Sequence, residues 1–195
     1  MIKDMDKYDR KVINEKLKRE FRRYSDTYSK LSEAAKMDYL KTAQPGEKVP
    51  ERVALSGEYA ERFQNTINDI RVNVDNLLRP IQEKLEASIT DAPSQEAANT
   101  IALLSTRKHI DQAEIEHLIN RYGDNVQAYN AIKDIASEHD VYLMNHQVLS
   151  DLEAVKSLAD TPSSFSLMNA NSGKATAGMI SFVEMSIDST FPTED

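Results

Sequence analysis

The chain has 195 residues, a length that argues against a multidomain enzyme. It has only 5 Gly and 6 Pro and no Cys or Trp, a composition that is typical of a mainly helical protein. The absence of cysteine excludes disulfides, thiolate catalysis and cysteine-based zinc or iron–sulfur sites. The formal net charge of −8 is uneven, because residues 1–36 carry +4 and the other 159 residues carry −12, a polarity that favours self-association or an N-terminal contact with an anionic partner.

The first predicted element is a long helix from about residue 4 to residue 41, a stretch without Gly or Pro. Its apolar residues recur at spacings of 4, 3, 4, 3 and 4, as in the seam of a coiled coil. Large aromatic side chains on this seam favour packing inside a bundle over a tight two-stranded coil. The seam residues are Leu17, Phe21, Tyr24, Tyr28, Leu31 and Ala35.

A turn at residues 44–50 contains Pro and Gly and separates this helix from a second, which we expect to reach about residue 89. Pro80 lies inside the second helix and should kink or divide it. Its predicted apolar face consists of Tyr59, Phe63, Ile67, Ile70, Val74, Leu77, Ile81 and Leu85.

Two long helices joined by a short turn predict an antiparallel hairpin. The same apolar stripes would serve equally well for packing within one chain or between chains of an oligomer. The candidate packing or oligomer seam is Leu17, Phe21, Tyr24, Tyr28, Leu31, Phe63, Ile67, Ile70 and Val74.

Shorter helices are predicted after residue 91. The first covers residues 95–104, and the second begins at Asp111, where Glu114 completes a capping box, and ends at Gly123, which would adopt positive φ. Asp124 or Asn125 can cap a third helix, and a fourth is expected around residues 148–158. The Ser-, Asn- and Gly-rich run 161–176 is typical of a loop or disorder, and residues 174–185 can form a last short element.

The predicted fold class is therefore all-α. It combines a long antiparallel helical hairpin with a coiled-coil-like seam, a cluster of shorter helices, and a flexible C-terminal segment. The corresponding segments are 1–90, 91–160 packed on the hairpin, and 161–195.

Motifs that carry chemistry are incomplete in this chain. Glu114 and His117 have the Glu-x-x-His spacing of di-iron bundles, but no other His has an acid three residues before it. The run ending in Gly173 and Lys174 resembles part of a phosphate-binding loop, yet Met168 replaces the first Gly. We therefore expect no catalytic residues, no metal site and no cofactor.

The stretch KLKREFRRY at residues 16–24 places five basic side chains beside the seam. One interpretation is the ordinary charged flank of a buried stripe. The other is a surface that contacts nucleic acid or the acidic half of a neighbouring copy, although aromatic rings buried in a seam cannot also stack on bases. The candidate anion or nucleic-acid contacts are Lys16, Lys18, Arg19, Arg22 and Arg23.

Residues 113–132, AEIEHLINRYGDNVQAYNAI, show an acidic helix that ends in Tyr-Gly-x-Asn and a second helix with Ala and apolar residues alternating. This pattern resembles small helical virion-associated or accessory proteins of tailed phages and prophages of Gram-positive bacteria. The resemblance implies a role in virion assembly or an accessory role, without catalytic residues.

The leading hypothesis is thus a noncatalytic phage-type structural or assembly protein that acts through helix-mediated self-association, with homo-oligomers and other virion proteins as partners. The alternative is a small accessory or regulatory protein that binds nucleic acid through its basic N-terminal helix. No segment of the sequence approaches the apolar length of a membrane span, and the first residues lack the apolar core that is typical of a signal peptide. We accordingly expect it in the host cytoplasm or the virion.

Overall fold

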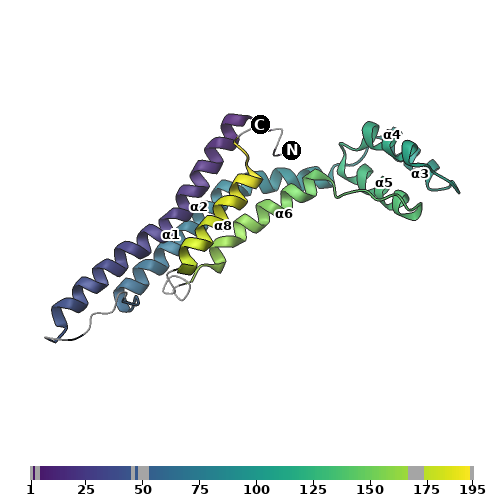
Figure 1. The fold of residues 1–195 in the computed structure, drawn as a ribbon. Coiled ribbons are helices and arrows are strands. Elements are labelled where there is room, and N and C mark those ends of the chain that lie inside the picture. The colour runs from purple at the N-terminus through teal and green to yellow at the C-terminus, as the bar shows by residue number, and fades with distance from the viewer. Residues whose placement is uncertain (1, 3–4, 45–46, 48–52, 167–173, 194–195) are drawn as a thin grey trace. The chain divides into compact units, whose positions relative to one another are not determined.

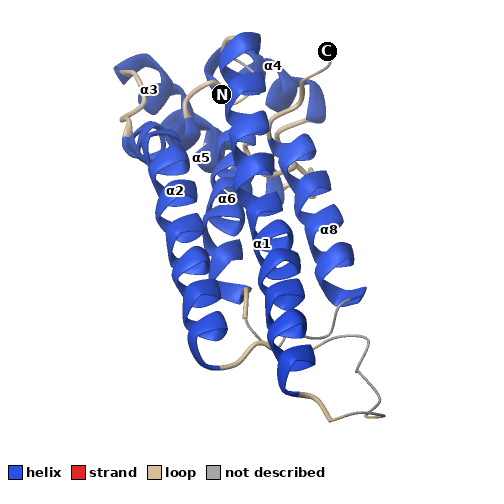
Figure 2. Ribbon diagram, turned by 90° about the vertical axis from the view of Figure 1, so that its left-hand side faces the viewer, coloured by secondary structure: helices blue, strands red, loops and turns tan. Residues whose placement is uncertain are grey.

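The computed structural model describes residues 2, 5–44, 47, 53–166 and 174–193 (Figures 1 and 2). Within these ranges the regular structure consists of seven α-helices and one short 3-10 helix, with no strand. The predicted all-α fold class is confirmed.

The chain divides into two compact units. The bundle unit comprises residues 2–79 and 154–195, and the short-helix unit comprises residues 80–153. Helices α2 (Gly57–Thr90) and α6 (Gln147–Asp160) each contribute one part to each unit. These boundaries differ from the predicted segments 1–90, 91–160 and 161–195, because hydrophobic periodicity locates the ends of a helix but not which parts of it share a core.

Helix α1 (Lys7–Thr42) begins where the Asp6 side chain accepts a hydrogen bond from the backbone N–H of Tyr8, at 2.8 Å. This contact satisfies one of the N–H groups that have no partner inside the helix. The helix is unbroken up to Thr42, as the lack of Gly and Pro predicts. It has the length to run along the whole bundle unit.

Helix α2 continues through Pro80, which removes one backbone hydrogen bond without ending the helix. The division between the two units falls at this residue. The predicted apolar face left out Leu78, which is fully buried, and included Leu77, which like Tyr59 and Ile81 is only partly buried. Leu77 and Leu78 both lie about one turn after Val74, so the spacing alone could not choose between them.

The last part of the chain contributes more helix to the bundle than the short element that the sequence predicts. The 3-10 helix η1 (Thr161–Ser164) follows α6 directly, and α8 (Lys174–Thr190) continues five residues beyond the expected end at Met185. Residues 167–173 of the predicted loop lie outside the described residues. One face of α8 is buried, through Ile180, Val183 and Ile187.

Helices α1, α8 and the first part of α2 lie side by side in the bundle unit (Figures 1 and 2). Their core contains an aromatic layer, which we define as Phe21, Tyr24, Tyr28, Phe63 and Phe165. The Tyr24 ring lies 5.1 Å from that of Phe63 and 4.3 Å from that of Phe165, measured between centroids. Phe21 meets Phe165 edge to face at 5.7 Å, and Tyr28 meets Phe63 at 5.6 Å. Contacts of this kind add to the apolar area that the rings bury.

The short-helix unit is built on α3 (Gln95–Leu104), α4 (Gln112–Tyr122) and α5 (Val126–Glu138). Each of the three begins with a side-chain cap, from Ser94, Asp111 and Asn125 respectively. Asn125 rather than Asp124 caps α5, which resolves that alternative. The buried core of the unit is Leu104, Ile110, Ile115, Leu118, Ile132, Ile135 and Ala136.

Two local details of α4 differ from the sequence-based expectation. Asp111 caps the backbone N–H of Glu114 at 2.8 Å, but the Glu114 carboxylate pairs with Arg107. Gly123 has φ −70°, so it does not need the left-handed conformation. A Cβ atom there would lie 2.3 Å from the carbonyl oxygen of Ile119, so the close approach of this backbone is what requires glycine.

We expect Phe21→Ala to lower the free energy of unfolding by about 3–5 kcal/mol, because it empties a site in the aromatic layer. Urea unfolding followed by far-ultraviolet circular dichroism measures this change. Phe182→Ala is the matched control, because the side chain of Phe182 is 67% exposed whereas that of Phe21 is 0% exposed. At low protein concentration this control should change stability by less than about 0.5 kcal/mol. Equal effects of the two substitutions would contradict the placement of Phe21 in the core.

Candidate functional site: the basic stretch of α1

The five basic residues of the KLKREFRRY stretch differ in what they contact. Lys18 Nζ lies 2.5 Å from Asp188 Oδ1, and Arg22 Nε lies 2.5 Å from Glu184 Oε1. Both acids belong to α8. Because residue 18 pairs with 188 and residue 22 with 184, α1 and α8 run antiparallel. Two of the five cations therefore face the acidic C-terminal half of the same chain.

Arg23 points toward α2 instead. Its Nη1 lies 2.6 Å from Glu20 Oε2, and its Nη2 lies 4.0 Å from an oxygen of Asp69. Glu20 is buried and also accepts a hydrogen bond from Asn73 Nδ2, at 2.9 Å. A buried carboxylate requires such partners, because desolvation without them is costly.

Asn14 is a buried polar contact that the sequence analysis missed. Its Nδ2 donates to Asp188 Oδ1 and to the backbone carbonyl of Phe191, both at 2.9 Å, and its side chain is 2% exposed. Asn14 and the buried Arg10 continue the seam toward the N-terminus at the same spacing of 4 and 3. Polar residues at seam positions could have signalled that a hydrogen-bonding partner lies opposite.

The α1–α8 contacts shift the ionisation of the groups involved. Hydrogen bonds from Lys18 and then Asn14 hold the pKa of Asp188 below its ordinary value. The hydrogen bond and negative charge of Glu184 raise the pKa of Arg22. Since these ion pairs are solvent-exposed, each contributes at most about 1 kcal/mol to stability. Their main effect is to fix which residues of α1 and α8 face each other.

Lys16 and Arg19 have no acidic partner among the described residues. They line an open hollow of about 290 Å³ between α1 and α2. Asn73 and Asn76 contribute amide groups to it from α2. Glu20 lines the hollow as well, but its carboxylate is paired with Arg23 and accepts from Asn73, so Lys16, Arg19 and Asn76 are the groups that can hold a small anion. Only two of the five cations are free to contact phosphates. A plot of the logarithm of nucleic-acid affinity against the logarithm of salt concentration would therefore have a shallow slope of about −2.

The candidate seam residues lie inside the bundle unit of a single chain. Leu31 is partly buried, and the other eight are buried: Leu17, Phe21, Tyr24, Tyr28, Phe63, Ile67, Ile70 and Val74. Their apolar surface is therefore covered by helices of the same chain. Any contact with another copy through these side chains would require the bundle to open.

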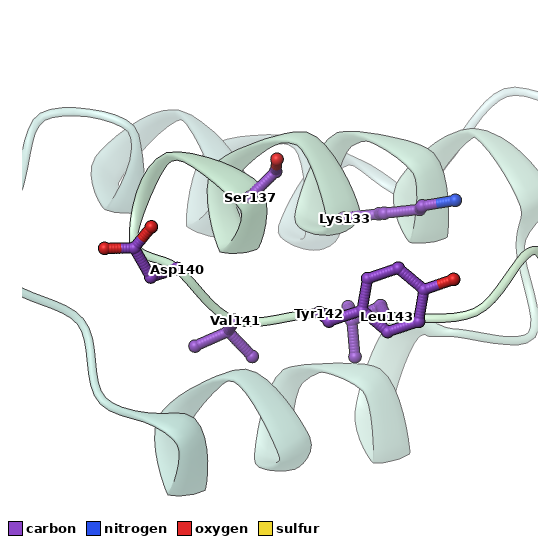
Figure 3. A pocket seen from close by; sticks show the side chains of 6 residues that line it. All are labelled: Lys133, Ser137, Asp140, Val141, Tyr142 and Leu143. Carbon is purple, nitrogen blue, oxygen red and sulfur yellow. The ribbon is translucent and has the colours of Figure 1, made fainter.

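A second hollow, of about 310 Å³, lies in the short-helix unit beside the segment 140–143, which follows α5 (Figure 3). Lys133 and Ser137 of α5 line it together with Asp140 and Tyr142. Lys133 Nζ donates to Asn145 Oδ1 at 2.7 Å, so its amine is held by an amide. The hollow is open, and this set of groups does not form a nucleophile with an adjacent base.

In the described part of the chain, no group of three or more His, Asp or Glu side chains is placed to hold a metal ion. The Glu-x-x-His pair is split, because Glu114 contacts Arg107 and His117 is exposed. None of the helices within the described ranges is long and apolar enough to cross a membrane.

Comparisons of the chain with protein-family models, with curated proteins and with solved structures found no match.

We expect Asp188→Asn to lower the free energy of unfolding at neutral pH and to have a smaller effect in acid. Because the folded-state pKa of Asp188 is lowered from 3.8, folding favours the carboxylate. This stabilisation is complete above the unfolded-state pKa and is lost as the pH falls through the folded-state pKa. Urea unfolding of both proteins at neutral pH and at steps below about pH 4 measures the difference.

Glu33→Gln serves as the control, because Glu33 is an exposed acid of α1. Its effect on stability should be smaller than that of Asp188→Asn at neutral pH. A stability difference for Asp188→Asn that stays constant or grows as the pH falls would contradict the contact of Asp188 with Lys18 and Asn14.

Proposed function

We propose that the chain is a noncatalytic structural or assembly protein of the phage-virion type, which acts through self-association and contacts with other proteins. The observation that carries this proposal is the outer face of α8, where Phe182 is 67% and Met185 is 62% exposed. Large apolar side chains that lie together on an exposed helix face are typical of protein–protein contact sites. A place in the virion or in the host cytoplasm belongs to the same proposal.

The contacts of the basic stretch with acids of its own chain support this proposal over nucleic-acid binding. Lys18, Arg22 and Arg23 already contact acids of the same chain. A phosphate backbone would have to compete with these acids for the three cations. Three of the five cations of the stretch are thus paired with acids in the folded chain.

The seam residues are covered by helices of their own chain, so the proposal puts self-association on a different surface from the seam. The exposed face of α8 needs no rearrangement of the core to reach a partner. An assembly protein that folds first and associates afterwards fits this separation of core and contact surface.

The alternative function is binding of nucleic acid or another anion by α1. The observation that favours it is the hollow next to Lys16 and Arg19, the two basic side chains of the stretch without acidic partners in the described residues. This alternative predicts an affinity that falls with salt and with charge reversal at these two positions.

Light scattering should show a mass above the monomer's 22.0 kDa at both low and about 0.5 M salt, with no change on addition of a short DNA duplex. At about 0.5 M salt the screening length is under about 5 Å, so contacts between charges weaken while apolar contacts persist. A Lys16→Glu, Arg19→Glu double variant is the matched control and should have the same mass as the parent.

A monomer that gains mass with DNA at low salt, and loses this gain in the double variant, would contradict the proposal. That result would make anion binding by Lys16 and Arg19 the better account.

A further inference from the structure

The exposed side of α8 carries a regular pattern of its own. Gly178, Phe182, Met185 and Ser189 are all exposed and follow one another at spacings of 4, 3 and 4. We call these four residues the outer strip of α8. This is the spacing at which one helix lies along another in a coiled coil. The opposite face, with Ile180, Val183 and Ile187, is already buried in the bundle. Helix α8 therefore presents two helix-packing faces, of which the chain itself fills one.

The outer strip carries no charge. The exposed residues of α8 between 178 and 189 include one charged residue, Asp188, which already contacts Lys18 and Asn14. The exposed faces of α1 and α2, in contrast, carry charged side chains such as Arg19 and Arg71. A solvated helix face in a chain with 29% charged residues normally includes charges of this kind. Covering the outer strip would therefore desolvate no unpaired ion, a cost that contacts on α1 or α2 would meet.

Gly178 adds an independent observation. A glycine inside a helix costs about 1 kcal/mol relative to alanine. A Cβ atom at Gly178 would meet nothing within 4 Å, and its φ is not positive. Among the described residues, packing and backbone conformation thus give no reason for glycine here. A second helix that approaches α8 closely would give one.

Resting on the assembly function proposed above, we propose that the outer strip binds the outer strip of a second copy, with the two α8 helices antiparallel across a two-fold axis. An axis midway between residues 182 and 185 places Phe182 of one copy against Met185 of the other. The same axis places Gly178 against Ser189. Each large side chain then meets a large one at the centre, and small residues lie at the ends where the helices approach.

The order of side-chain sizes along the outer strip selects a second copy as the occupant. It is small, large, large, small, so an antiparallel two-fold pairs the strip with itself and brings no charged group into the contact. One helix pair of this length belongs at the small end of interface sizes, below about 1,200 Å². The dimer is therefore weak, and its mass should rise with concentration between about 1 µM and about 500 µM.

The test uses two single variants, Phe182→Glu and Met185→Lys, and their equimolar mixture. Each places a charge at the centre of the contact and should weaken self-association by about 100-fold or more, which leaves a monomer of 22.0 kDa. In the mixture, the carboxylate introduced at position 182 of one copy faces the ammonium introduced at position 185 of the other. At the symmetric position the unchanged Met185 and Phe182 still face each other. Light scattering and sedimentation should therefore show that the mixture regains a dimer.

Val72→Glu is the matched control, because Val72 is 52% exposed on α2 in the same unit. It should self-associate like the parent protein. Circular dichroism of each variant should match that of the parent, since Phe182, Met185 and Val72 are all exposed and their replacement leaves the core intact.

The outcomes separate this inference from the proposed function. If the parent protein associates but Phe182→Glu and Met185→Lys associate equally well, self-association uses another surface and only this inference is overturned. If both variants are monomeric and their mixture stays monomeric, the antiparallel pairing is overturned. If the parent protein is a monomer over the whole concentration range, the inference and the proposed self-association both fail.

Discussion

The aromatic layer around Tyr24 is the interaction on which the bundle unit depends. The Tyr24 ring packs between those of Phe63 and Phe165, and its hydroxyl donates to the backbone carbonyl of Ser166 at 2.8 Å. One side chain of α1 thus joins α2 and the segment that follows η1. Burial raises the pKa of Tyr24 to about 12, because the charged phenolate would be desolvated inside the core. Once the layer holds α1, α2 and Phe165 together, the α1 seam residues Leu17, Phe21, Tyr24 and Tyr28 are buried, and only Leu31 among the five candidates keeps partly exposed apolar surface.

That constraint determines how the remaining surfaces can be used. With the seam filled, the basic flank of α1 lies against α8, where Lys18 and Arg22 meet Asp188 and Glu184. The uneven charge of the sequence is therefore partly balanced within the chain, and the antiparallel order of α1 and α8 follows from these pairs together with buried Asn14. One side of α8 is used in this way, and its uncharged other side stays exposed and can meet a partner. The proposed assembly function and the proposed α8 dimer both follow from this division of α8 into an inner and an outer face.

Local patterns predicted the helices well, because a helix is specified by residues within a few positions of one another. Caps such as Asp111, and the 4 and 3 spacing of the seam, are readable for that reason. Contacts that join segments distant in the sequence could not be predicted from these local patterns. Phe165 lies in a Ser-rich run typical of a loop, and only its approach to α1 shows that it is part of the core. Leu77 and Leu78 are adjacent on the helix, so the choice between them depends on what lies opposite. The candidate basic site was identified by composition, but composition could not show that Asp188 and Glu184 would pair with Lys18 and Arg22.

The most direct test of this account is whether α1 and α8 of the same chain lie together. Because the chain has no cysteine, a Lys18→Cys, Asp188→Cys variant carries only the two introduced thiols. Treatment with a short bifunctional thiol reagent at high dilution, followed by denaturing gel electrophoresis, separates internally linked monomers from linked dimers. The account predicts that the product is almost entirely an internally linked monomer, and that a Lys16→Cys, Asp188→Cys control links much less. Linked dimers as the main product at the same dilution would show that α1 pairs with α8 of another chain, and would contradict the intramolecular bundle.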